Sequence, residues 1–242
     1  MKISQLKSRL VATFGVLTLI GCTGAVEPEQ TGANLAAKEG APGEAADAIA
    51  LAHLAAEVAS YGRQANNARA MLVAAELLAS VGGNEEARER TEEPVDGDGG
   101  SGETGEKDGD PEIDTVGTLL ADARAFAGDD AALIESIERV ESQEGRGRRS
   151  GPAYHVDRVS ARSNHTYSLT FAGGNRAMIA VIGDGDTDLD LLVYDENQNL
   201  VCSDTDYTDR TVCSFTPAWT GNFRVTISNV GYVWNQYVLR TN

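Results

Sequence analysis

The sequence predicts an α+β protein with two parts, a small α-helical unit followed by an all-β sandwich of jelly-roll type. Over residues 44–82 and 113–143, apolar residues recur at intervals of three and four, the spacing of one helix face. From Tyr154 onward the interval changes to two, and glycine- and asparagine-containing turn signals separate short apolar runs. A chain of 242 residues is long enough for two small domains of this kind.

The first residues predict an export signal over 1–21. Lys2, Lys7 and Arg9 form a cationic start, and a largely apolar run over 10–20 follows. That run is too short to span a hydrocarbon core of roughly 30 Å, so the segment is a signal peptide rather than a spanning helix.

The end of this segment, Leu19-Ile20-Gly21-Cys22, resembles the lipobox of bacterial lipoproteins. In those proteins the cysteine receives a diacylglycerol and becomes the first mature residue. The resemblance implies an exported protein anchored to a membrane through Cys22; the alternative is an ordinary signal peptide with a chance cysteine. Thr23 follows in place of aspartate, which favours the outer membrane, on its periplasmic or surface face. Residues 22–43, which contain several glycines and prolines, are expected to form a flexible tether.

Two helical hairpins are predicted, over 44–82 and 113–143, and together they can form a small four-helix unit. Gly82-Gly83 is a stop signal for the first hairpin, and Gly128 separates the helices of the second. The apolar positions expected to face the core are Leu51, Leu54, Val58 and Tyr61, then Met71, Leu72, Ala75 and Leu78, then Val116, Leu119, Ala123 and Phe126, then Leu133, Ile134, Ile137 and Val140.

An acidic segment over 83–112 separates the hairpins. Between residues 85 and 112 there are twelve acidic and three basic side chains and no aromatic residue. Such a composition cannot bury enough apolar surface to offset its ordering entropy, so disorder is expected. The alternative role is cation sequestration. Residues 144–151 are read as a short basic linker.

The β-sandwich is expected over residues 152–242. Its strands are predicted from apolar residues that alternate with polar ones, whereas 177–182 is apolar on both faces, as in a central strand. The alternating positions are Tyr167, Leu169 and Phe171, then Leu189, Leu191 and Val193, then Phe223, Val225 and Ile227, then Tyr237 and Leu239.

Cys202 and Cys213 are the two cysteines that remain besides Cys22. An even number in an exported chain predicts a disulfide. A zinc site is less favoured, because it needs further ligands and no histidine is close in sequence.

Seven aspartates form the candidate metal site. Asp184, Asp186, Asp188 and Asp190 would share one face of an extended segment, and a second acidic loop lies between the cysteines with Asp204, Asp206 and Asp209. Like charges on one face need compensation, and calcium accepts six to eight oxygen ligands in adaptable geometry. The spacing is not that of an EF-hand, since Leu189 stands where that loop needs glycine. The alternative is that these residues only form turns and keep a sheet edge soluble.

The stretch GDGDTDLDLLVYDENQNLV, the later PAWTGNF and the strand over 229–239 resemble the bacterial pre-peptidase C-terminal domain. The likeness covers about residues 152–242; the helical part resembles no family. It implies a β-sandwich of the kind attached to secreted enzymes, often peptidases, and to many proteins without an enzyme. Related collagen-binding modules hold calcium at their edge.

Catalysis is not predicted. The sequence contains no H-E-x-x-H or G-x-S-x-G motif, and His155 and His165 have no suggestive partner. A net charge of -17 makes nucleic acid a poor partner. The expectation is therefore a non-catalytic, lipid-anchored cell-envelope protein whose sandwich binds or adheres to a protein or glycan ligand. The alternatives are an accessory subunit that docks a secreted hydrolase and, less favoured, a hydrolase in its own right.

Overall fold

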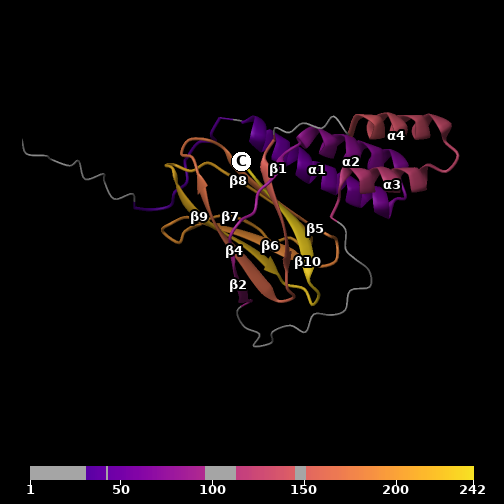
Figure 1. The fold of residues 1–242 in the computed structure, drawn as a ribbon. Helices are drawn as coiled ribbons and strands as arrows, with labels where there is room; N and C mark the ends of the chain where they lie inside the picture. Colours follow the sequence, from indigo (N-terminus) through magenta and orange to yellow (C-terminus); the bar gives the residue numbers. More distant parts are fainter. Residues whose placement is uncertain (1–30, 42, 96–112, 145–150) are drawn as a thin grey trace, which may run out of the picture. The chain divides into compact units, whose positions relative to one another are not determined.

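A computed structural model describes residues 31–41, 43–95, 113–144 and 151–242. The predicted signal peptide, Cys22 and most of both predicted linkers lie outside these ranges. From residue 32 onward, the described residues form one unit, in which four helices and two five-stranded sheets are seen (Figure 1). The helices are α1 (Glu44–Gln64), α2 (Ala68–Val81), α3 (Val116–Ala127) and α4 (Ala131–Glu144).

The four helices form the two predicted hairpins, and local capping defines where they start. The side chain of Asn67 accepts hydrogen bonds from the N–H groups of Arg69 and Ala70 at the start of α2. Thr115 and Thr118 form a capping box at the start of α3. The predicted stripes of α2, α3 and α4 contribute Met71, Leu119 and other residues to one shared core, so the hairpins pack as a four-helix unit.

The predicted core stripe of α1 is wrong. Leu54 is 47% exposed and Tyr61 is 59% exposed. The buried face of α1 consists of alanines with Ile49, because this helix packs against a sheet and not only against its partner helix. Small side chains permit that close approach, and Arg210 fixes it by donating from Nε to Glu57 Oε1 at 2.7 Å.

Ten strands form the sandwich, which confirms the predicted fold class. The first sheet has the order β1-β3-β10-β5-β8 and the second has the order β2-β4-β9-β6-β7. The strands are β1 (Asn84–Glu85), β2 (Thr91–Pro94), β3 (Ala153–Val159), β4 (Ser163–Phe171), β5 (Ala177–Gly183), β6 (Leu189–Tyr194), β7 (Leu200–Asp204), β8 (Arg210–Phe215), β9 (Gly221–Asn229) and β10 (Asn235–Thr241).

The sandwich core follows the predicted alternation. Tyr167, Leu191, Phe223 and Leu239 are all fully buried between the two sheets. Strand β5 is apolar on both faces because its inward residues enter this core while Met178, Ala180 and Ile182 pack against α1. The outer face of the first sheet is therefore a second packing surface, which α1 covers over β5.

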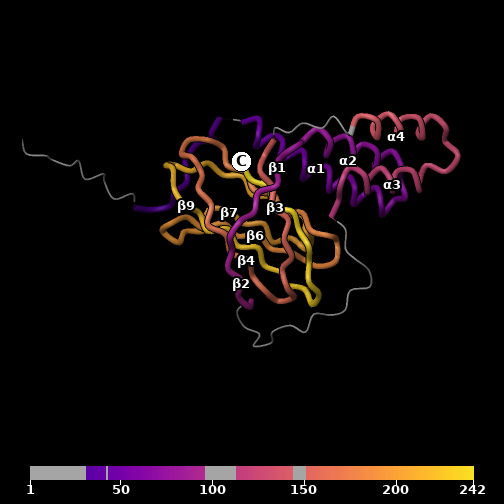
Figure 2. The backbone as a smooth tube through the Cα atoms, viewed as in Figure 1, coloured from indigo at the N-terminus to yellow at the C-terminus, as the bar shows by residue number. Residues whose placement is uncertain are grey.

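The start of the acidic segment is ordered, which corrects the prediction of disorder for this part. Strand β1 pairs in parallel with β3, and β2 pairs antiparallel with β4. Most of their side chains remain exposed, so the segment needs no apolar residues to form strands. Its backbone instead pairs with strand edges that would otherwise leave N–H and C=O groups open. The tube in Figure 2 shows this part of the chain crossing the sandwich.

The end of the predicted tether also packs on the sandwich. Asn34 is fully buried, and its side chain accepts from Trp219 N at 3.0 Å and donates to Trp219 O at 3.1 Å. The N–H of Ala36 donates to Thr216 O. These contacts are made by the side-chain amide of Asn34 and by backbone groups. The glycine and proline content of the segment does not indicate such contacts, so the sequence predicted a flexible tether here. Any free tether therefore ends before residue 32.

The predicted disulfide is present between Cys202 in β7 and Cys213 in β8, with 5.9 Å between their Cα atoms. Because β7 and β8 belong to different sheets, the bond joins the two layers at one edge of the sandwich. Within the described residues, no helix has the length and apolar character needed to cross a membrane.

Candidate functional site

Three regions carry chemistry: the acidic edge, a buried polar network in the sandwich, and a groove between the helices and the first sheet. At the acidic edge, Leu189 and Leu191 point into the core, so Asp188 and Asp190 lie on the opposite side of β6. Asp184 and Asp186 do not share that face as predicted, because they precede β6 in a turn where Gly185 has a φ of 93°.

Three other aspartates of this edge accept hydrogen bonds from backbone N–H groups. Asp184 Oδ2 accepts from Gln236 N at 2.7 Å, and Asp204 Oδ2 accepts from Val212 N at 2.8 Å. Asp206 Oδ1 accepts from Thr208 N at 2.9 Å. The Asp206 bond is the local kind expected of a turn residue, whereas the other two join Asp184 to β10 and Asp204 to β8.

Asp209 is buried and takes part in several contacts at the same edge. It accepts from the N–H of Gly185 and from Asn235 Nδ2, and it pairs with Arg210 at 3.1 Å. These contacts hold the loop before β8 against the loop before β6.

The edge still contains uncompensated charge. Burial, together with the neighbouring charges of Asp188, Asp204 and Asp206, raises the pKa of Asp190 to about 6. Burial and two neighbouring aspartates also raise the pKa of Asp188. In the part of the chain that the structure describes, however, no three carboxylate, histidine or cysteine side chains are grouped so that they could hold a metal ion. Calcium binding by the seven aspartates therefore stays a prediction.

We expect Asp190→Asn to raise the melting temperature at pH 7 by a few degrees. The folded-state pKa of Asp190 lies above the ordinary value of 3.8, so the folded protein becomes less stable as pH rises from about 4 to about 6 and the carboxylate ionises. The asparagine variant should lack this part of the pH dependence. Calorimetry of the wild type and the variant at pH 4 and pH 7 measures this difference. Equal pH dependence of the melting temperature in the two proteins would contradict the prediction.

The same melts in chelator, calcium and magnesium at matched ionic strength test the cation. A calcium site should raise the wild-type melting temperature, magnesium should do much less, and Asp190→Asn should reduce the gain. Equal wild-type melting temperatures in all three conditions would leave the aspartates as turn and edge residues.

The buried network lies around His165, for which the sequence suggested no partner. His165 Nδ1 lies 2.7 Å from Tyr237 Oη, which lies 2.5 Å from Tyr167 Oη. Tyr167 Oη also donates to Asp157 Oδ2 at 3.3 Å, and that oxygen accepts from Arg90 Nε at 2.6 Å. Arg90 comes from the segment before β2, so the acidic segment supplies the cation that balances Asp157.

Burial dominates the electrostatics of this network. Burial, with a smaller contribution from the nearby Arg90, lowers the pKa of His165 to about 4. Burial raises the pKa of Tyr167 and of Tyr237, so both phenols stay protonated at neutral pH. All three side chains are fully inaccessible to solvent. The network therefore serves as a polar core, with its imidazole and phenols out of reach of a substrate.

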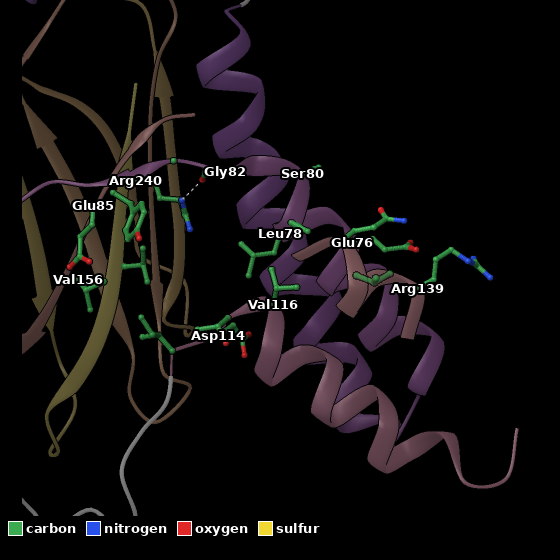
Figure 3. Close-up of a pocket in the computed structure, with 18 residues that line it drawn as sticks. Glu76, Leu78, Ser80, Gly82, Glu85, Asp114, Val116, Arg139, Val156 and Arg240 are labelled. Atoms are coloured by element: carbon green, nitrogen blue, oxygen red, sulfur yellow. Dashed lines mark hydrogen bonds between the residues drawn. The ribbon is translucent and has the colours of Figure 1, made fainter. Parts of the chain in front are cut away.

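The groove is a hollow with a volume of about 890 Å³. One wall is the outer face of β3 and β10, which presents Tyr154, Val156 and Val238. The other wall is formed by the helices, with Leu78 of α2 and Val116 of α3 (Figure 3). Its volume lies in the range of ligand pockets, and its walls are mainly apolar at the centre.

Charged groups line the rim of the groove. Glu76, Glu85, Asp114 and Arg139 are joined there by Arg240 of β10. Asp114 is neutralised by Arg63 of α1. Arg240 extends from the sheet towards the helices and donates from Nη1 to Gly82 O at 3.4 Å (Figure 3).

Reasoning from the sequence missed this groove, because its residues come from three helices and three strands distant in the chain. One signal was available. In β10, Val238 lies on the face opposite Tyr237 and Leu239, so this strand is apolar on both sides. Because α1 covers the apolar outer face of this sheet only in part, another partner is needed to cover the rest. The groove lies between that face and the helices.

Fold and groove together define a two-sheet β-sandwich protein with a four-helix unit packed against one sheet. No protein-family model matches the sequence, and a search of curated proteins gives no match. Among solved structures, the chain is similar to the pre-peptidase C-terminal domain of a collagenase from Bacillus anthracis, with 13% identity and a TM-score of 0.29, over 36% of this chain and 87% of that one.

A de novo designed double-stranded β-helix is also similar, with 8% identity and a TM-score of 0.25, over 37% of this chain and 97% of that one. The first match is a domain of the class that the sequence resembles. At these TM-scores, neither similarity carries an argument about family or function.

Proposed function

We propose that this protein is a non-catalytic, lipid-anchored protein of the bacterial cell envelope that binds a ligand with an apolar surface in the groove between its helices and its sandwich. One observation carries the proposal: a hollow of about 890 Å³ with apolar walls lies between two separately packed cores. Apolar surface left uncovered at such a junction is typical of ligand sites.

The geometry refines the role expected for the sandwich. Binding is assigned to the outer face of β3 and β10 together with α2 and α3, rather than to the sandwich alone. The helices then have a function, because they supply the second wall. A non-catalytic role is supported by the enclosure of His165 and its two tyrosine partners in the core.

Blocking the groove tests the proposal. In the chain produced from residue 23 onward, which carries no acyl group, we expect the neutral dye Nile red to bind and its fluorescence to rise. Ala79 is exposed on α2 and lines the groove, so Ala79→Trp should fill it and weaken binding at least tenfold. Ala125 is exposed on α3 away from the groove, and Ala125→Trp serves as the matched control. Equal binding by both variants would overturn the assignment.

The anchor is tested separately, in the producing cell. We expect Cys22→Ser to move the protein from the membrane fraction to the soluble fraction, because it removes the thiol that would carry the acyl chains. Each buried methylene of such a chain contributes about 0.8 kcal/mol to membrane binding. Fractionation followed by immunoblotting measures the distribution. A variant that still partitions with detergent would exclude this anchor.

A further inference from the structure

The groove contains a guanidinium that has no carboxylate partner among the described residues. Arg240 lies on the outward face of β10, with its guanidinium carbon 4.9 Å from the centre of the Tyr154 ring. Its Nε is buried without a hydrogen-bond partner, and its described protein contacts are the ring of Tyr154 and the carbonyl of Gly82. Across the described ranges, no carboxylate lies within ion-pair distance of it.

Several other arginines pair with carboxylates. Arg63 pairs with Asp114, Arg90 with Asp157, and Arg210 with Glu57. A buried guanidinium without such a partner is costly, because it loses hydration and gains no opposite charge. Burial accordingly lowers the pKa of Arg240. The stacked tyrosine compensates only in part, because a cation–π contact contributes about 0.5–2 kcal/mol.

We propose that Arg240 binds the carboxylate of a ligand whose aliphatic chain occupies the groove, so that the ligand class is a long-chain monocarboxylate. This inference rests on the proposed binding function and adds the chemistry of the ligand. A guanidinium offers a planar pair of donors that fits a carboxylate in bidentate geometry. Val156, Val238 and Leu78 supply the apolar surface for the chain.

The other charges of the groove limit the ligand to one anionic group. Glu76 and Glu85 line the same hollow, and the carboxylate of Glu85 points away from Arg240 in Figure 3. A second negative charge on the ligand would face these glutamates without a paired cation. Arg139, the other groove arginine, already lies within 4.0 Å of Glu135.

The test uses cis-parinaric acid, a naturally fluorescent eighteen-carbon carboxylate, and its methyl ester, with the chain from residue 23 onward. We expect the wild type to bind the acid at least tenfold more tightly than the ester. Arg240→Gln should remove that difference and leave ester binding unchanged, whereas Arg240→Lys should retain part of it. Arg224→Gln is the matched control and should bind like the wild type, because Arg224 also stacks on a tyrosine ring, 4.4 Å from the centre of Tyr194, but lies outside the groove.

The variants are expected to fold, because removing an unpaired buried charge does not expose a new one. Two results would support the assignment. The melting temperature of Arg240→Gln should be no lower than that of the wild type, and adding cis-parinaric acid should raise the melting temperature of the wild type only. Equal binding of acid and ester by the wild type would overturn the carboxylate assignment and leave the groove as a neutral site. Binding of neither probe, with no Nile red binding, would overturn the proposed function as well.

Discussion

A fall in pH from 7 to 4 is expected to lower the free energy of unfolding by about 3 kcal/mol through His165 alone. Its folded-state pKa of about 4 lies below the ordinary value of 6.5, so the unfolded chain binds the proton more readily. The stability that comes from the neutral imidazole is therefore complete above about pH 6.5 and is lost as pH falls towards 4. The groups that face this ring are Tyr237, Glu92, Asp157 and Arg90.

The matched variant is His165→Gln, which keeps a polar side chain beside Tyr237 but does not titrate. Urea unfolding of both proteins at pH 7 and pH 4 isolates the histidine, because Asp190 and the other carboxylates titrate alike in both. The wild type should lose about 3 kcal/mol more than the variant on acidification. Equal losses would mean that the imidazole is not held neutral in the core.

Replacing both Cys202 and Cys213 by alanine is expected to destabilise the protein by roughly 3 kcal/mol. The bond closes a short loop, with a sequence separation of 11, and chain entropy assigns about this stabilisation to such a loop. For a chain of this size, the melting temperature should fall by roughly 6–12 °C. The double variant loses this stability because no bond between the β7 and β8 segments restrains its unfolded chain.

Two measurements control this result. Wild-type protein reduced with dithiothreitol should melt at the temperature of the double variant, and a non-reduced tryptic digest should contain the two cysteine peptides joined. Free thiols in the exported protein would contradict the pairing. A double variant with the same melting temperature as the oxidised wild type would contradict the expected stabilisation.

The sequence predicted the elements whose packing is local or repetitive. The alternation of Phe223, Val225 and Ile227 is a direct consequence of one strand face meeting the core, so β9 could be recognised without knowing its neighbours. The stripe through Leu119 and Ala123 predicted α3 for the same reason. The disulfide followed from the number of cysteines in an exported chain.

Long-range partners were not predictable in the same way. Leu54 and Tyr61 follow a helical period, yet the sheet selects the alanine face of α1, because only small side chains allow helix and strand to approach closely. Strands β1 and β2 carry charged residues that indicate disorder by composition. They form because the edges of β3 and β4 offer unpaired backbone groups and because Asp157 is paired by Arg90.

For the candidate site, the sequence located the acidic residues and missed the groove. A pattern of aspartates is visible in a linear sequence. Arg240 becomes distinctive only in the structure, where no described carboxylate lies within ion-pair distance of it. Val156 and Val238 likewise read as ordinary strand residues until the helices provide the facing wall.

The location of binding is tested most directly by photolabelling with a diazirine-bearing aliphatic alcohol, followed by mass spectrometry of the cross-linked residues. The ligand is neutral and small, so it reports apolar binding independently of Arg240. The account predicts saturable labels within 78–83, 113–116, 154–156 or 238–240, which line the groove. Labels confined to the loops at the acidic edge, or spread without saturation over the surface, would contradict it.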